Sequence, residues 1–148
     1  MASALTPSPH LAEVTTVGPI VIKPRVAPGS GAQSSRSVAI FNTGGTIGMH
    51  VNEAGSLEPC PGYLAERMLA MPEFGHGDDM PAVDLYELLP LIDSSDMAPA
   101  DWLRIASAVR EHYDEYDSFV VIMGTDTLAY AASALSFVLE NLGKRWAR

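Results

Sequence analysis

The sequence predicts an α/β domain with a mostly parallel sheet. Short apolar runs typical of buried strands alternate with helix patterns along most of the 148 residues. Each of the three strand-like runs stops at a loop rich in glycine, hydroxyl groups or carboxylates. Strand–loop–helix units repeated in this way are characteristic of parallel sheets covered by helices.

Residues 1–36 precede this alternation, and we expect them to form a flexible leader. Pro, Ser, Thr, Gly and Ala dominate the stretch, and it sustains no period of 2 or 3.6. Residues 15–22, TTVGPIVI, are apolar enough to pair as a strand, but the internal Gly-Pro argues against that assignment. The folded domain is therefore expected over residues 37–148.

The first unit begins with the run SVAIF, residues 37–41, which stops at an Asn-Thr-Gly-Gly turn. A short helix is predicted over 61–71, where Leu64 and Met68 stand four residues apart and Pro61 suits a first turn. The Met-Pro pair that follows ends this helix.

The second unit has a polar loop at 73–81 and a strand over 82–92, which is interrupted or ended near Pro90. The next helix is expected to begin near Pro99, and Asp101 favours the positive end of its dipole. Its apolar residues are spaced by four, three, four and three positions, which predicts one buried stripe: Trp102, Ala106, Val109, Tyr113 and Tyr116.

The third unit contains the clearest buried strand, FVVIM at 119–123. A helix is predicted to follow, with Gly143 as its stop. One face of this helix is expected to be apolar and to pack inward: Leu128, Ala131, Ala132, Leu135, Val138, Leu139 and Leu142.

Composition excludes several classes of function. The net charge of −9 would repel phosphate backbones, so no nucleic-acid partner is expected. No apolar run approaches the length of a membrane span. The single cysteine, Cys60, cannot form an internal disulfide, which favours a cytoplasmic location. The four histidines form no ligand spacing, so no metal is expected.

Three loops follow the predicted strands: NTGGTIGM at 42–49, DSSDM at 93–97 and GTDT at 124–127. Open α/β sheets bind ligands at the carboxyl ends of their strands, so we look for a site there. In the first loop, Gly44 and Gly45 allow a sharp bend, which would hold out the hydroxyl of the threonine that follows.

Each loop also has a simpler explanation when it is taken alone. Two glycines are ordinary turn residues, and Ser, Thr and Asp are favoured caps for the helices that follow the other two loops. The first loop matches neither a P-loop nor the G-x-G-x-x-G dinucleotide fingerprint.

Taken together and in this order, TGGTIGM, DSSDM and FVVIMGTDTLAYAASALSFVLENLGK resemble the start of a cytoplasmic, bacterial type I L-asparaginase. The resemblance extends from about Val38 to Lys144. It implies the N-terminal Rossmann-like domain of the asparaginase fold, incomplete at its C-terminal end. It also implies hydrolysis of L-asparagine to L-aspartate and ammonia, with no cofactor.

The resemblance assigns roles to residues by motif. Thr46 would be the nucleophile that attacks the side-chain amide. Thr125 would join a relay with a lysine, and Asp126 would hold the α-amino group of the substrate. Finally, the loop that contacts the α-amino and α-carboxylate groups would comprise Asp93, Ser94 and Ser95. A threonine hydroxyl needs such activation, since it is a weak nucleophile by itself.

The chain departs from the family pattern at several positions. Ser56 stands where bacterial members carry a tyrosine in a mobile lid, and Met123 stands where histidine is usual. The only lysine after the third loop is Lys144, which comes too early to match the relay lysine. The C-terminal domain of the family does not follow, so we expect residues 37–148 to be a partial N-terminal domain.

The truncation leaves two alternatives to an active L-asparaginase. One is a catalytically dead fragment that binds asparagine or regulates a full-length chain. The other is the related subunit of glutamyl-tRNA amidotransferase. Full-length relatives form homo-oligomers, whereas the truncated chain is expected to be impaired in both assembly and turnover.

Overall fold

The computed structural model describes residues 15–23, 36–76, 80–140, 143 and 145–147. A five-stranded sheet has the order β1 (Thr15–Lys23), β5 (Ala82–Leu89), β2 (Ser37–Asn42), β6 (Ser118–Ile122) and β7 (Arg145–Ala147). The central strand β2 is parallel to both β5 and β6, and β6 is parallel to β7. Only β1 is antiparallel to its neighbour. The predicted α/β class with a mostly parallel sheet is therefore confirmed.

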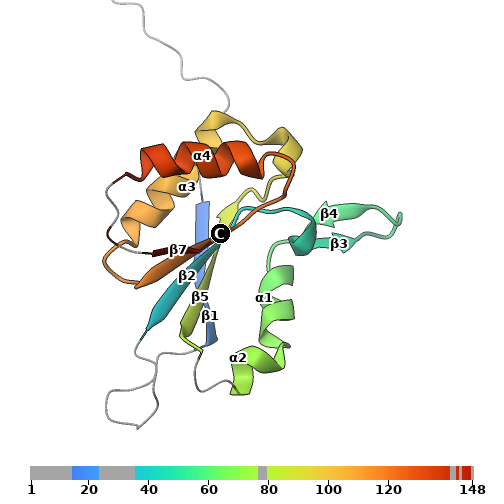
Figure 1. Ribbon diagram of the computed structural model, residues 1–148. Helices are drawn as coiled ribbons and strands as arrows, with labels where there is room; N and C mark the ends of the chain where they lie inside the picture. The colour runs from blue at the N-terminus through green and yellow to red at the C-terminus, as the bar shows by residue number, and fades with distance from the viewer. Residues whose placement is uncertain (1–14, 24–35, 77–79, 141–142, 144, 148) are drawn as a thin grey trace, which may run out of the picture.

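Helices cover both faces of this sheet (Figure 1). The longer pair, α3 (Pro99–Glu111) and α4 (Leu128–Val138), lies on one face, while α1 (Tyr63–Leu69) and α2 (Pro72–His76) lie on the other. None of the helices described is long and apolar enough to cross a membrane.

A small hairpin extends away from the sheet, to the right in Figure 1. Its strands are β3 (Met49–Val51) and β4 (Leu57–Pro59), which pair antiparallel. The side chain of Asn52 organises the turn, because its Oδ1 accepts hydrogen bonds from the N–H groups of Ala54 and Ser56 at 3.0 and 2.9 Å. The sequence patterns did not predict this hairpin.

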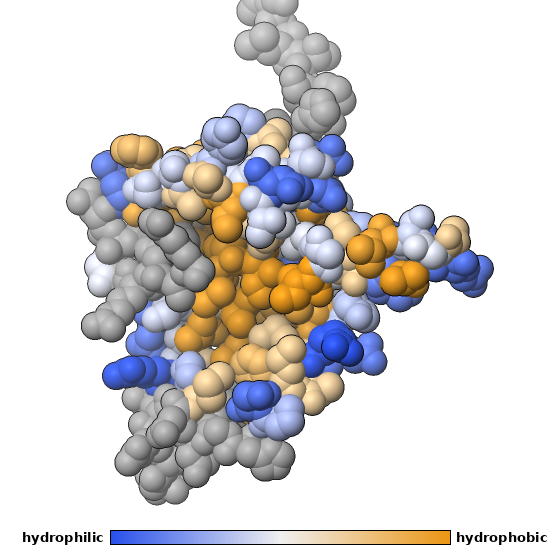
Figure 2. Space-filling model, turned by 45° about the vertical axis from the view of Figure 1, so that its right-hand side comes forward, coloured by the Kyte–Doolittle hydropathy of each residue, from blue (hydrophilic) through white to orange (hydrophobic). Residues whose placement is uncertain are grey.

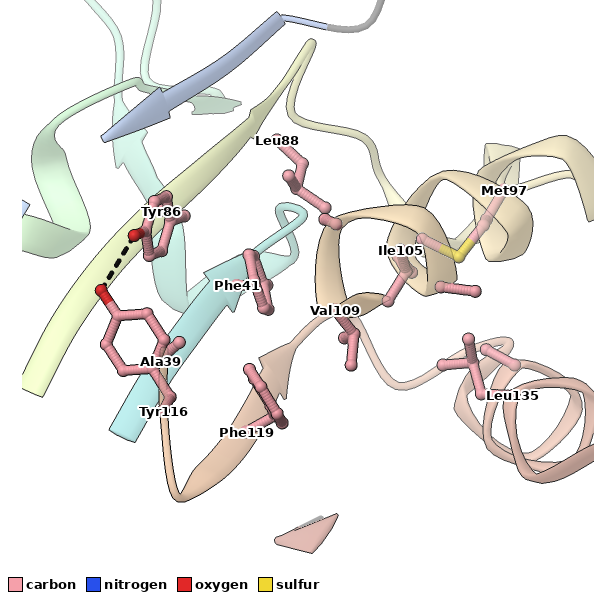
Figure 3. Close-up of a cluster of buried hydrophobic side chains, with 13 residues drawn as sticks. Ala39, Phe41, Tyr86, Leu88, Met97, Ile105, Val109, Tyr116, Phe119 and Leu135 are labelled. Atoms are coloured by element: carbon pink, nitrogen blue, oxygen red, sulfur yellow. Dashed lines mark hydrogen bonds between the residues drawn. The ribbon is translucent and has the colours of Figure 1, made fainter. Parts of the chain in front are cut away.

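The face under α3 and α4 holds the larger core (Figure 3). Phe41 of β2 lies at its centre, with its ring centroid 5.3 Å from that of Tyr86 and 6.3 Å from that of Phe119. From α3, Ile105 and Val109 pack against these rings and are fully buried. Each fully buried side chain of this size stabilises the fold by about 1.5–3 kcal/mol.

The opposite face is only partly covered. Alternation along β2 and β5 places Ile40 and Leu85 on this side, where they pack against Leu64 and Met68 of α1. Several apolar strand residues at the margin of this cluster are only partly buried: Val38, Val120 and Ile122. Figure 2 shows a continuous apolar area beside the hairpin on this side of the molecule.

Strand β1 corrects the expectation of a flexible leader for part of residues 1–36. Thr15–Lys23 pairs with β5, and the Gly-Pro pair is accommodated by a register irregularity between Val17 and Ile20. An edge strand tolerates such an interruption, because one side of its backbone has no ladder to maintain. Residues 1–14 and 24–35 lie outside the described residues, and the boundary at residue 37 stays a prediction.

Three further expectations need correction. The short helix α2 begins at Pro72 and extends into the predicted polar loop. In α4, Leu128 and Val138 are 41% and 47% exposed, whereas Ala131 and Leu135 are buried. The reason is that α4 packs mainly against α3, which uses a narrower stripe than a sheet face would. The helix also ends at Val138, before the predicted stop.

Candidate active site

The three predicted loops meet at the carboxyl edge of the sheet. Thr43, just after β2, ties them together through its backbone: its N–H donates to the carbonyl of Ile122 at 2.9 Å, and its carbonyl accepts from the N–H of Ile92 at 2.8 Å. Since β5 and β6 flank β2 on opposite sides, the chain leaves β2 at a topological switch point, where open α/β sheets form ligand sites.

The glycine turn is pressed between the other two loops. Gly44 and Gly45 have φ angles of 119° and 91°, which side chains rarely tolerate. A Cβ atom on Gly45 would lie 2.5 Å from the backbone nitrogen of Gly124, and one on Gly44 would collide with the backbone of Ile92. Glycine is therefore needed at both positions for two reasons: the backbone bends through positive φ angles, and it lies against the backbones of Ile92 and Gly124.

Thr46 comes directly after this contact and is exposed. It begins a 3₁₀ turn, Thr46–Gly48, in which the N–H of Gly48 donates to the carbonyl of Gly45 at 3.0 Å. Gly124 precedes Thr125 and Asp126, which are also exposed. The Gly45–Gly124 contact thus brings together the parts of the chain that carry three of the predicted catalytic residues.

Ser94 joins the second loop to the third. Its side chain is buried, and its Oγ both donates to Oδ2 of Asp126 and accepts from the N–H of Asp126, each at 3.2 Å. Thr127 adds a bond from its Oγ1 to the carbonyl of Ser94 at 2.8 Å. The Ser94 hydroxyl therefore orients Asp126 in this structure.

Asp93 and Ser95 form a local pair at the edge of the same loop. The carboxylate Oδ1 of Asp93 accepts from the backbone N–H and from the hydroxyl of Ser95, both at 2.9 Å. The backbone bond and then the hydroxyl bond lower the pKa of the Asp93 carboxyl from its ordinary value, since both favour the charged form. The Asp93 carboxyl therefore contributes a negative charge to this edge of the sheet at neutral pH.

Exposed hydroxyls and carboxylates thus lie beside the glycine turn at one edge of the sheet. A hydroxyl beside fixed N–H donors is suited to acyl transfer, and carboxylates are suited to holding an ammonium group. Among the residues that the structure describes, no group of three histidine, cysteine or acidic side chains is arranged to hold a metal ion.

The residues at which the chain departs from the family pattern have different surroundings. Ser56 lies in the turn of the β3–β4 hairpin and is exposed. Met123 is partly buried against the larger core. Lys144 is outside the described residues.

Sequence reasoning missed two buried polar residues behind the turn, Asn42 and Glu87. The carboxamide Nδ2 of Asn42 donates to Oε1 of Glu87 at 3.3 Å, and Oδ1 of Asn42 accepts from the N–H of Gly44 at 3.1 Å. A detectable signal was present, because Glu87 is one of two acids, with Asp84, in a largely apolar strand.

Comparison with known proteins identifies the family. The family model for the N-terminal domain of asparaginase matches residues 37–145 of this chain. The chain belongs to the asparaginase family. The fold and the motif order predicted from the sequence agree with this asparaginase assignment.

Individual relatives agree with the assignment. L-asparaginase 1 of Escherichia coli K12 is 53% identical over 109 residues, which cover 74% of this chain and 32% of that protein. The human 60 kDa lysophospholipase is 44% identical over 129 residues, covering 74% and 22% respectively. The crystal structure of L-asparaginase I from Vibrio cholerae superposes with a TM-score of 0.61 at 46% identity, over 69% of this chain and 30% of that one. The asparaginase-family chain thus spans about a third or less of the length of these relatives.

Proposed function

We propose that this chain carries the nucleophile-bearing part of an L-asparaginase, which hydrolyses L-asparagine to L-aspartate and ammonia. The observation that carries the proposal is the Gly45–Gly124 contact, because it sets Thr46 close to the loop of Thr125 and Asp126. Membership of the asparaginase family supports the same reaction class.

In the proposed reaction, the Thr46 hydroxyl attacks the side-chain carbonyl of asparagine, and backbone N–H groups of the glycine turn stabilise the developing oxyanion. Collapse of this intermediate breaks the C–N bond, and the leaving nitrogen takes the proton lost by the hydroxyl. Water then hydrolyses the ester on Thr46, which releases aspartate and restores the hydroxyl.

The remaining site residues would hold the substrate. Asp126 would bind the α-amino group, and Ser94 would fix the orientation of Asp126 through the two hydrogen bonds between them. Asp93 and Ser95 would contact the α-amino and α-carboxylate groups, and Thr125 would belong to the proton relay. No cofactor takes part in this scheme.

The cellular setting follows from the resemblance to type I enzymes. We place the protein in the cytoplasm, with homo-oligomers formed by full-length relatives. The alternative of a glutamyl-tRNA amidotransferase subunit is less favoured, because a net charge of −9 would repel tRNA.

Ammonia release from asparagine by the purified 148-residue chain tests the proposal. We expect slow turnover that Thr46→Ala abolishes and Thr46→Ser retains in part, because only serine keeps a hydroxyl at this position. A relay that lacks its lysine lowers the rate by about 10²–10⁴-fold, so the assay must detect single turnovers. Equal ammonia release by wild type and Thr46→Ala would refute the assignment of Thr46 as the nucleophile.

Calorimetry with asparagine, combined with the ammonia assay, distinguishes an active enzyme from a non-catalytic fragment that only binds asparagine. Binding together with Thr46-dependent turnover supports the enzyme, whereas binding without any turnover favours an asparagine-binding or regulatory fragment. Release of ammonia only in the presence of glutamyl-tRNA would favour the amidotransferase subunit.

A further inference from the structure

The segment between Gly44 and Gly62 contains Thr46 and the whole β3–β4 hairpin, and both of its ends are held by one buried pair. At the first end, the N–H of Gly44 donates to Oδ1 of Asn42 at 3.1 Å. At the second end, the N–H of Gly62 donates to Oε1 and Oε2 of Glu87 at 3.0 and 2.9 Å. Because Asn42 also donates to Glu87 at 3.3 Å, a continuous chain of hydrogen bonds connects the two ends.

Both members of this pair are withdrawn from solvent. Asn42 is 0% exposed and Glu87 is 2% exposed, and no other acid among the described residues is buried to this degree. Removing a carboxylate from water costs several kcal/mol, and only well-placed donors offset that cost. An apolar residue would fit the neighbouring cluster around Leu85 at far lower cost, so packing alone does not account for Glu87.

The carboxylate also determines which way the Asn42 amide points. Both carboxylate oxygens of Glu87 accept hydrogen bonds in this structure, and Asn42 turns the NH₂ group of its amide toward Glu87. The amide oxygen is then directed at the N–H of Gly44, which is the first glycine of the glycine turn that precedes Thr46. Asn42 is also close to the end of the 3₁₀ turn, since a Cβ atom on Gly48 would lie 3.7 Å from Nδ2 of Asn42.

We propose that Glu87 and Asn42 are positioning residues, which hold the turn carrying Thr46 and the base of the hairpin in a fixed relation to each other. This proposal rests on the proposed asparaginase function for its effect on catalysis. Neither residue touches substrate in this scheme. They act on the nucleophile through the backbone of Gly44, and on the hairpin through the backbone of Gly62.

Exchanging the donor and the acceptor tests the pair. In Asn42→Asp, a second carboxylate faces Glu87, so the bond between the two side chains is replaced by repulsion. In Glu87→Gln, an NH₂ group faces the N–H of Gly62, and one acceptor is lost. The double variant, Asn42→Asp with Glu87→Gln, restores the bond between the side chains. Its glutamine amide would donate to the new carboxylate through NH₂ and accept from the N–H of Gly62 through its oxygen.

We expect Asn42→Asp to lower kcat by about tenfold or more with little change in KM, and the double variant to recover most of that loss. The loss should fall on kcat because the pair orients the glycine turn that precedes Thr46, whereas residues of other loops hold the substrate. Ser107→Ala, at an exposed position of α3, is the control and should match wild type. A double variant no better than Asn42→Asp would overturn the proposal.

Amide hydrogen exchange provides a second readout that needs no turnover. Exchange at Gly44 and Gly62 should become faster in Asn42→Asp and return to the wild-type rate in the double variant, while amides of the α3 helix stay protected in all three proteins. If wild type shows no turnover but exchange follows this order, the proposed function fails and the positioning role stands. Unchanged exchange at Gly44 and Gly62 in both single variants would refute the positioning role itself.

Discussion

Thr43, Gly44 and Gly45 show how much of the candidate site depends on single residues. Both backbone groups of Thr43 are used to join neighbouring loops, so the turn that follows has little freedom. Gly44 and Gly45 then pass through φ angles of 119° and 91° while touching Ile92 and Gly124. The exposed hydroxyl of Thr46 is therefore presented by a backbone that is fixed on two sides.

Replacing Gly45 by alanine should damage the fold more than any ordinary glycine substitution. Gly55, in the turn of the hairpin, is the matched control, because its φ is 80° but a Cβ there meets nothing within 4 Å. We expect Gly55→Ala to cost about 1–2 kcal/mol, which is the cost of the left-handed backbone alone. Gly45→Ala should cost at least about 3 kcal/mol in free energy of unfolding, because the clash with Gly124 is added.

Denaturant unfolding of both variants beside wild type measures this difference. Equal losses of unfolding free energy in the two variants would mean that the backbones of the first and third loops are farther apart than described.

At the scale of the elements, a cluster of two tyrosine hydroxyls and one carboxylate connects β5 to the segment that leads into β6. The hydroxyl of Tyr116 donates to Oδ2 of Asp84 at 2.7 Å and lies 2.8 Å from the hydroxyl of Tyr86, as Figure 3 shows for the tyrosine pair. Burial, followed by these hydrogen bonds, raises the pKa of Tyr116 above its ordinary value of 10.0. The folded protein thus retains the Tyr116 proton at pH values where the unfolded chain releases it.

This pKa shift predicts a specific loss of stability in alkali. A group whose pKa is higher in the folded state stabilises the fold below its unfolded pKa, so that contribution declines as the pH rises above about 10. Tyr116→Phe should lower the free energy of unfolding by about 1–3 kcal/mol at neutral pH, because buried partners lose a hydrogen bond. Its stability should also decline less steeply above about pH 10.

Tyr130→Phe is the control, since Tyr130 is 68% exposed and should behave like wild type at every pH. Urea unfolding at a series of pH values is the measurement. A Tyr116→Phe variant with the same alkaline slope as wild type would contradict the assignment of this loss to Tyr116.

The elements also show where sequence patterns succeed and where they do not. Phe119 of the predicted buried strand and Ala106 and Val109 of the predicted α3 stripe are buried, because hydrophobic periodicity reflects which face is buried. Both predictions extended too far, since Val120 and Ile122 are only partly buried and α3 ends at Glu111, before Tyr113 and Tyr116. Strand β1 was missed because a strand with Gly-Pro inside it is held by its pairing with β5, a contact that local composition does not record. The hairpin of β3 and β4 was missed because its strands have only three residues each.

The candidate site was predictable to a similar extent. Loops at strand ends could be expected to meet, since parallel strands share one carboxyl edge, and the structure brings the three loops together. The pair of Asn42 and Glu87 could not be predicted, because its two residues are 45 positions apart and no local pattern connects them. The catalytic roles of Thr46, Thr125 and Asp126 stay predictions.

At the scale of the whole molecule, net charge and exposed apolar area have opposite effects on self-association. The net charge of −9 keeps copies of the chain apart, while the partly covered sheet face shown in Figure 2 favours their association. Salt weakens only the first of these effects, because it shortens the Debye length from about 30 Å at 0.01 M to about 3 Å at 1 M.

Self-association should therefore increase with salt. We expect the apparent mass measured by light scattering to rise between low and high ionic strength at constant protein concentration. Val120→Thr, which places a hydroxyl on the partly buried β6 residue, should reduce the rise. An apparent mass that is independent of salt, or that falls as salt is added, would exclude this balance of forces.

The two backbone bonds of Thr43 have a consequence for the order of events during protein synthesis. The carbonyl of Ile122, which Thr43 needs, leaves the ribosome 79 residues later than Thr43 itself. Until then, β2 has a neighbour at most on its β5 side, and the glycine turn can contact Ile92 but not Gly124. The nascent chain can therefore bury the part of its core formed by β2, β5 and α3 before the three loops at the carboxyl edge of the sheet can meet.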